Sequence, residues 1–362
     1  MSQPTPAASE TLAGVQALRA LAATAVAVAH VGAEFDGHLA LPGLLPNLVY
    51  GAAGVDLFFV ISGFVMVYAS ERLFGREGAF RTFMLRRVIR IVPIYWAMTT
   101  VMLLYVMARG FAASDASPAL AFWSYFFIPY PRPSGSPGPL YGLGWTLNYE
   151  MMFYLLFGCA LFARRHMAVL IVTAVLVAFA IFHALAPPLS VQIDFWTNPI
   201  ILEFVLGMGL ALVYRWGARL PRSVCYALAA CALAIFVSTL TANPQPRWLV
   251  WGGPAAMLVA AVTLADRSSY VPSTVVALGD ASYALYLIHP AVNVVTRHAA
   301  WQGLYLPPAT TPWLYLIVTT FLSILAAFAV HYWAERPVSG YLKQKLMTPR
   351  KRQAAPGLDS GM

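Results

Sequence analysis

Arg19 and His30 are the first residues of this sequence whose chemistry conflicts with their surroundings, because both lie inside one long apolar stretch. They are eleven positions apart. At about 100° per residue, eleven positions of an α-helix return to nearly the same face, roughly 16 Å further along the axis. An ionisable group in such a stretch is costly and usually marks a substrate path or a catalytic site. We therefore expect one helix face to offer a cation and a base.

Four further ionisable residues interrupt apolar segments: Asp56, Glu150, Glu203 and His289. Carboxylates are not left unpaired in hydrocarbon, so these groups are expected to face inward and share partners around a polar cavity. For Asp56 and Glu203 a purely structural role, as buried hydrogen-bond partners of helix ends, is an alternative, and for Glu203 the two interpretations are evenly balanced. For His289 the functional and structural interpretations are also evenly balanced.

A basic cluster opens another apolar segment, where Arg86, Arg87 and Arg90 are spaced three and four residues apart. This spacing brings the three side chains toward one helix face. Ordinary anchoring at the cytoplasmic mouth of a span would explain the cluster. Arginine is also suited to bidentate phosphate contact, so a bulky anionic cofactor could dock there.

The composition places these residues in a membrane protein. Apolar residues make up 60% of the chain and charged residues 10%, against roughly 45–50% and 25% in soluble domains. We therefore predict an all-α, polytopic transmembrane helix bundle in a lipid bilayer. The ten predicted spans are 12–34, 49–70, 87–108, 142–163, 167–186, 194–214, 223–241, 248–266, 278–297 and 313–334.

The basic residues predict the orientation. Most of the 23 Lys and Arg residues fall in alternate loops if both termini face the cytoplasm. The net charge of +9 is then a topology signal, and no nucleic-acid partner is expected. We predict a cytoplasmic N-terminal segment at 1–11, a membrane domain at 12–340 and a basic cytoplasmic tail at 341–362. The three cysteines lie within predicted spans, so neither a disulfide framework nor a metal site is expected.

Seven motifs, taken in order, resemble the integral-membrane acyltransferase family 3, and any one of them alone would be a weak signal. The resemblance covers about residues 12 to 340, nearly the whole chain. It is carried by Arg19 to His30, the run GVDLFFVISGF at 54–64, Arg87 and Arg90 before Pro93, Trp145 to Glu150, Glu203 to Met208, Ser282 to His289, and Glu335-Arg336-Pro337. Within the family, the chain looks most like the exopolysaccharide and O-antigen O-acetyltransferases.

The resemblance implies an enzyme of the cell inner (cytoplasmic) membrane. Members of the family transfer acyl groups, commonly acetyl from cytoplasmic acetyl-CoA, to hydroxyls of envelope or exported polysaccharides. The carbohydrate acceptor would be a polysaccharide or a lipid-linked glycan. By resemblance, the functional positions are Arg19, His30, Arg87 and Arg90.

The chemistry of acyl transfer assigns roles to the candidates. The reaction needs a base for the sugar hydroxyl, a donor for the developing oxyanion and a grip on the anionic acyl donor. We expect His30 to be the base, with Asp56, Glu150 or Glu203 as the carboxylate that orients its ring.

The remaining candidates are expected to bind the two substrates. Arg87 and Arg90 would hold the phosphates of acetyl-CoA, with Arg19 part-way along the path. His289, Glu203 and Trp145 are the expected contacts of the acceptor. Since Ser62, Ser282 and Cys159 all have ordinary packing explanations, we expect direct transfer in a ternary complex without an acyl-enzyme.

Two other classes of function remain open from the residues alone. A transporter or flippase also keeps ionisable residues at the membrane midplane. A non-catalytic subunit of a polysaccharide export machine would also be a multi-pass protein. Loss of His30 would leave glycan acylation unchanged in the second case, which separates it from an enzyme.

Overall fold

The computed structural model describes residues 6–38, 49–187, 189–239, 245–266, 270–303 and 311–347. Over these ranges the chain is almost entirely helical, which confirms the predicted all-α class. The sheet of the described part consists of two short antiparallel strands, β1 (Tyr130–Pro131) and β2 (Pro137–Gly138). The tail at 348–362 and the first five residues lie outside the described part of the chain.

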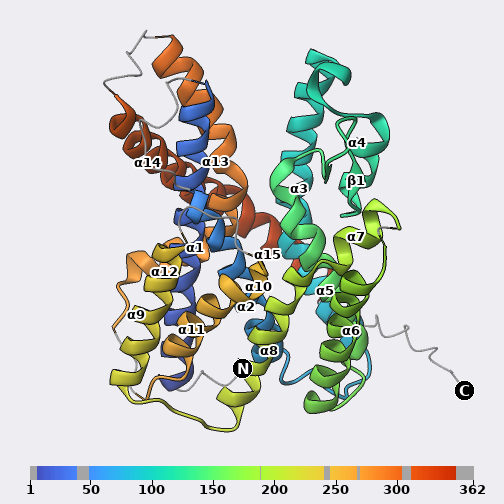
Figure 1. The fold of residues 1–362 in the computed structure, drawn as a ribbon, viewed down its shortest axis with the longest axis vertical. Coiled ribbons are helices and arrows are strands. Elements are labelled where there is room, and N and C mark those ends of the chain that lie inside the picture. The colour runs from blue at the N-terminus through green and yellow to red at the C-terminus, as the bar shows by residue number, and fades with distance from the viewer. Residues whose placement is uncertain are drawn as a thin grey trace, which may run out of the picture.

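The helices form two groups with a central set between them (Figure 1). One group surrounds α1 (Pro6–His38), which packs against helices from the C-terminal half of the chain. The helices of this group that pack against α1 are α11 (Gly252–Thr263), α12 (Ser273–Asp280), α13 (Ser282–Thr296) and α14 (Pro312–Val330). In the same group, α9 (Arg222–Ser238) packs against α11, and η5 (Arg297–Gln302) packs against α13.

The second group is built from the middle of the sequence. It contains α3 (Ala79–Arg109), η2 (Ala112–Ser114), α4 (Pro118–Tyr125), η3 (Gly142–Gly144), α5 (Trp145–Ala160), α6 (Arg165–Leu185) and α7 (Val191–Thr197). Between the groups lie η1 (Val49–Ala52), α2 (Ala53–Ala69), η4 (Pro199–Ile201), α8 (Leu202–Arg215), α10 (Arg247–Val250), η7 (His331–Glu335) and α15 (Arg336–Met347).

Several of these helices are long and apolar enough to cross a bilayer. Five segments meet that description, and a sixth does if α12 and α13, which meet at a 70° bend, form one span. The protein is therefore a multi-pass membrane protein. Each of the ten predicted spans overlaps helical residues, but α2 and α9 are shorter than a full span, so the number ten and the cytoplasmic termini stay predictions. The five segments are Ala13–Phe35, Ala79–Arg109, Arg165–Leu185, Val191–Arg215 and Pro312–Met347.

Close backbone contact holds α2 and α8 together in the centre of the bundle. A Cβ on Gly63 would lie 2.2 Å from the carbonyl oxygen of Phe204, and one on Gly207 would lie 2.0 Å from that of Val60. Small residues at a helix interface allow this approach. The contact fixes the position of α2, which carries Asp56 and Ser62, relative to Glu203 at the start of α8.

The segment after α3 is ordered by local capping. Gly110 follows α3 with φ of 90°, a conformation that favours glycine at a helix end. Ser117 caps α4 by accepting a hydrogen bond from the amide of Leu120. In the hairpin loop, the amide and hydroxyl of Ser134 donate to the two carboxylate oxygens of Asp115, and these bonds lower the pKa of Asp115.

The C-terminal helices correct one predicted boundary. The helix of α14 passes through the π-helical turn η7 into α15, which ends at Met347. Residues 341–347 are therefore helical and continue the bundle, although we expected a tail to begin at 341. At the other end, α1 begins at Pro6 rather than at residue 12.

Candidate active site

A wide basic recess opens between α3, α15 and the first half of α1. Its empty space, open solvent included, is about 1380 Å³. Two carboxylates, Asp280 and Glu335, also line it, so positive charge predominates. The six cationic residues of this recess, called the basic mouth below, are Arg19, Arg86, Arg87, Arg90, Arg336 and Lys343.

A proline in α3 helps to position α15 across this mouth. Pro93 has no amide hydrogen, so the carbonyl of Ile89, four residues earlier, lacks its usual helical donor. The hydroxyl of Ser339 on α15 donates to that carbonyl at 3.3 Å. The hydroxyl of Tyr283 on α13 donates to the carbonyl of Ile91 at 2.7 Å. Both neighbouring helices are thus attached to the part of α3 that carries the arginines.

A second, mostly apolar cavity continues from the basic mouth into the bundle. Its empty space, open solvent included, is about 730 Å³. Arg19, Arg87 and Arg90 line both this cavity and the mouth, so the two spaces meet at these three side chains. The cavity wall includes Val55, Phe58, Phe59, Ile61, Val65, Met66, Leu147 and Tyr286.

Glu150 is the carboxylate of this inner cavity. The hydroxyl of Ser62 donates to its Oε1 at 3.1 Å, and the hydroxyl of Tyr154 donates to its Oε2 at 2.8 Å. The guanidinium of Arg87 lies 5.9 Å from the ring centre of Tyr154. The lining of the two spaces together has six cationic residues and three carboxylates, so positive charge is in excess, as the binding of an anionic ligand requires.

His30 and His289 form a pair beyond the inner cavity. Their ring centres are 5.1 Å apart, and Tyr286, which lines the cavity, lies 6.3 Å from His289. His289 is fully buried, whereas His30 is exposed. We expected His30 to be a buried base, and the expected burial is wrong. Its ring neighbour is an imidazole rather than one of the three expected carboxylates.

Asp56 and Glu203 belong to a different cluster, in which Arg247 is the central residue. The Nε and Nη2 of Arg247 donate to the two oxygens of Asp56 at 2.9 and 2.7 Å. Both carboxylates are fully buried. The guanidinium lies 4.9 Å from the ring of Trp251 and 6.0 Å from that of Trp145.

The Arg247 cluster lies outside the lining of the two described spaces. Neither Asp56 nor Glu203 lines the inner cavity or the basic mouth. Gly252 packs against Glu203, because a Cβ there would lie 2.7 Å from its Cγ. A structural role therefore fits Asp56, which Arg247 holds, whereas both carboxylate oxygens of Glu203 are buried without a hydrogen-bond partner among the described residues. The roles of both residues stay predictions.

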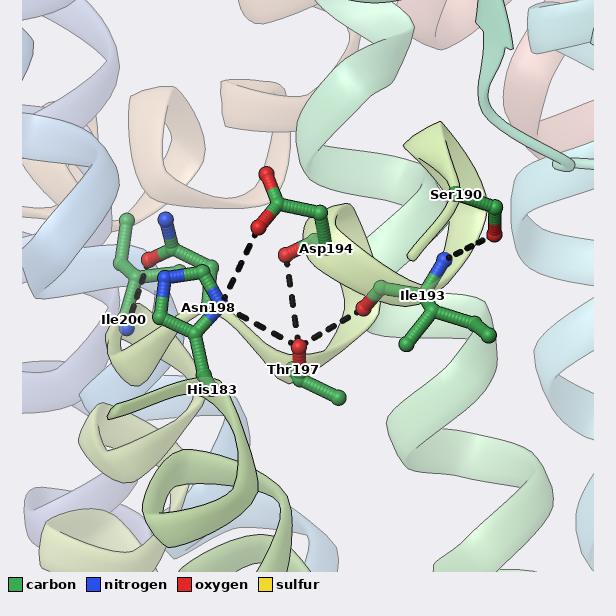
Figure 2. Close-up of polar contacts among 7 residues, drawn as sticks. All are labelled: His183, Ser190, Ile193, Asp194, Thr197, Asn198 and Ile200. Atoms are coloured by element: carbon green, nitrogen blue, oxygen red, sulfur yellow. Dashed lines mark hydrogen bonds and ion pairs between the residues drawn. The ribbon is translucent and has the colours of Figure 1, made fainter. Parts of the chain in front are cut away.

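A third polar cluster joins the end of α6 to α7 (Figure 2). The Nδ1 of His183 lies 3.5 Å from a carboxylate oxygen of Asp194 and 3.2 Å from the hydroxyl of Thr197. A hydroxyl, histidine and carboxylate are together here, as in a nucleophilic triad. However, the Thr197 hydroxyl donates to the carbonyl of Ile193 at 2.7 Å, so the cluster is read as a helix connection.

Sequence reasoning missed several residues of these clusters. Tyr154 follows Glu150 by one helical turn, and that spacing was an available signal. Arg336 and Lys343 of the mouth are seven positions apart on an amphipathic helix, which also was an available signal. Arg247 had none, because its partner Asp56 is 191 positions away.

A helical membrane protein with a basic mouth leading into an apolar cavity is suited to handling a ligand with an anionic head and an uncharged arm. A family model, described as an acyltransferase domain, matches residues 12–332 of the chain. The chain therefore belongs to acyltransferase family 3, and it is an acyltransferase.

Curated relatives agree with this assignment. The chain is 34% identical over 310 residues to the exopolysaccharide production protein ExoZ of Rhizobium meliloti, covering 84% of this chain and 92% of that protein. It is 28% identical over 317 residues to the acyltransferase MdmB of Streptomyces mycarofaciens, covering 77% and 78%. It is also 27% identical over 154 residues to the peptidoglycan O-acetyltransferase OatA of Listeria monocytogenes, covering 39% and 23%. No solved structure matches the chain.

Proposed function

We propose that this protein transfers an acetyl group from cytoplasmic acetyl-CoA to a hydroxyl of an envelope or exported polysaccharide, in the cell inner membrane. The observation that carries the proposal is the shared position of Arg19, Arg87 and Arg90, which line both the basic mouth and the apolar cavity. The relatives named for exopolysaccharide production and peptidoglycan O-acetylation support a glycan acceptor.

The anionic part of the donor fits the basic mouth. Arginines on α3 can make bidentate contacts to phosphate oxygens, and Arg336 and Lys343 add positive charge from the opposite wall. The apolar cavity suits the uncharged pantetheine arm and the acetyl thioester. Glu150 balances part of the arginine charge and holds the hydroxyls of Ser62 and Tyr154 in place.

The histidine pair supplies the base. His30 takes the proton of the acceptor hydroxyl, and the sugar oxygen forms a bond to the thioester carbonyl carbon. The carbon–sulfur bond then breaks, and the CoA thiolate receives the proton from His30. Exposure of His30 agrees with this role, because the bulky acceptor must reach the ring.

The test is acetyl transfer by the purified protein in lipid nanodiscs, with labelled acetyl-CoA and deacetylated polysaccharide from a strain lacking the gene. We expect His30→Ala to lower transfer at least about a hundredfold, the usual contribution of a general base. Arg87→Lys and Arg90→Lys should raise the donor KM, because lysine lacks the planar fork. His183→Ala is the matched control and should behave like the wild type.

Near-normal transfer by a well-folded His30→Ala protein would overturn the assignment of the base. An unchanged donor KM in both lysine variants would favour the alternative that Arg87 and Arg90 only anchor the helix in the membrane. Stable label on the polypeptide in the absence of acceptor would replace direct transfer by an acyl-enzyme route.

A further inference from the structure

The backbone contacts of His30 and His289 fix which ring nitrogen carries the hydrogen. The Nδ1 of His30 lies 2.8 Å from the carbonyl oxygen of Val26, and the Nδ1 of His289 lies 3.0 Å from that of Leu285. A carbonyl oxygen can only accept, so each Nδ1 must donate. In the neutral imidazole the other nitrogen is then an acceptor. Both rings therefore present an Nε2 lone pair on the side away from their own helix backbone.

The Nε2 of His289 is buried and has no hydrogen-bond partner among the described residues. A buried acceptor without a donor is costly, so it requires an explanation. The neighbouring Tyr286 hydroxyl does not supply the donor, because it bonds to the carbonyl of Leu143 at 3.0 Å and pairs with the hydroxyl of Thr146. Within the described part of the chain the acceptor atom is thus left without a donor, next to the exposed ring of His30.

The two rings belong to different helices that pack together, α1 and α13, with 5.1 Å between the ring centres. Rings this close place their two acceptor nitrogens within reach of two donors attached to neighbouring atoms of one ligand. A vicinal diol is such a ligand, since each hydroxyl donates one hydrogen and the two oxygens sit on adjacent carbons. A single hydroxyl can satisfy only one of the two nitrogens.

We infer that His30 and His289 together form a vicinal-diol subsite, so that His30 contacts the hydroxyl that is acetylated and His289 binds its neighbour. The acceptor is then a sugar unit with two adjacent free hydroxyls. This inference rests on the proposed function and extends it, because it names the chemical feature that selects the acceptor. His289 takes no proton from the reacting hydroxyl in this arrangement and contributes binding and orientation.

Small alcohols test the subsite in the wild-type protein without any substitution. In the nanodisc assay, cis-cyclohexane-1,2-diol should inhibit competitively against the polysaccharide, with an inhibition constant about five- to tenfold lower than that of cyclohexanol. This difference corresponds to one added neutral hydrogen bond. Equal inhibition by the diol and the monool would overturn the inference.

The variants His289→Gln and His30→Gln separate binding from chemistry. We expect His289→Gln to raise the acceptor KM about tenfold, to leave the donor KM unchanged and to remove the preference for the diol. His30→Gln should instead lower kcat. His183→Gln, in the cluster of Figure 2, is the matched histidine control and should keep wild-type constants.

Nitrogen NMR of ¹⁵N-histidine-labelled protein provides a readout of the tautomers. The signals lost in His30→Gln and His289→Gln should both belong to rings protonated at Nδ1 only. A ring protonated at Nε2 would contradict the subsite even if both variants lost activity. Absence of acceptor-dependent transfer by the wild type would refute the proposed function itself, which is a different outcome from an unchanged acceptor KM in His289→Gln.

Discussion

Two clusters of charge in this bundle have opposite balances. In the lining of the inner cavity, three arginines, Arg19, Arg87 and Arg90, accompany the single carboxylate Glu150. Around Arg247, two buried carboxylates face one guanidinium. The first cluster borders open space and has cationic charge to offer a ligand. In the second, called the closed cluster below, the two carboxylates are fully buried, and the Arg247 side chain, 24% exposed, lies against two tryptophan rings. Both clusters are charged, and they differ in whether their side chains line an open space. That difference distinguishes a candidate binding site from a structural connection.

The largest effect should follow from removal of the cation of the closed cluster. Arg247→Ala leaves Asp56 buried without its partner, and breaking such a pair costs about 3–5 kcal/mol. We expect a large loss of stability in thermal unfolding of the detergent-solubilised protein. Arg109→Ala removes an exposed arginine at the end of α3 and is the control. Equal thermal stability of the two variants would show that the pairing of Arg247 with Asp56 does not stabilise the fold.

The close contact between α2 and α8 at Gly207 is the next target. Gly207→Ala would place its Cβ 2.0 Å from the carbonyl oxygen of Val60 and force α8 away from α2. Overpacking of this kind costs about 1–3 kcal/mol. Gly209→Ala, two positions along the same helix, meets nothing within 4 Å and should be neutral or slightly stabilising. The two melting temperatures decide the matter, and indistinguishable values would argue against the close contact.

Matched amide variants should separate the functions of the two clusters. Glu150→Gln removes the charge that faces the arginines and weakens its bonds to Ser62 and Tyr154, so we expect about a tenfold loss of transfer rate with little change in stability. Glu203→Gln lies outside the cavity lining and should keep the wild-type rate. A reversed result, with Glu203 controlling the rate, would restore the catalytic interpretation of the closed cluster.

The smallest expected effect is at Asp115, which belongs to neither cluster. Its pKa is lowered by hydrogen bonds from Ser134, so its contribution to the hairpin is present above the usual pKa of aspartate, near 4. This contribution is lost as the pH falls through the lower folded pKa. At neutral pH, hydrogen exchange in the hairpin should be faster in Asp115→Asn than in the wild type. Lowering the pH should speed hydrogen exchange less in the variant than in the wild type. The same acid dependence in both proteins would contradict this.

The sequence predicted the class of fold, and four of its candidate site residues, Arg19, Arg87, Arg90 and Glu150, line the inner cavity. Apolar runs identify membrane helices, because the bilayer demands them, and the spacing of Arg87 and Arg90 indicates a shared face. Arg19 and these two arginines do line the same spaces. Their role in binding the donor stays a prediction.

Pairings between distant segments could not be predicted. Nothing near Asp56 in the sequence indicates that Arg247 is its partner, because tertiary packing alone brings α2 and α10 together. For the same reason, three carboxylates were equal candidates to orient His30, and the structure places His289 beside it instead. The breaks at Pro199 and at the α12–α13 bend likewise depend on local backbone geometry that hydropathy does not report.

The meeting of the two spaces at three arginines also bears on the energetics of transfer across a charged membrane. With the phosphates held at that junction, only the uncharged arm and acetyl group continue inward along the apolar wall. A voltage acts on moving charge, at about 2.3 kcal/mol per elementary charge per 100 mV. Under the proposed function no net charge crosses with the acetyl group, so the reaction should proceed at the same rate in polarised and depolarised vesicles, driven by the thioester alone.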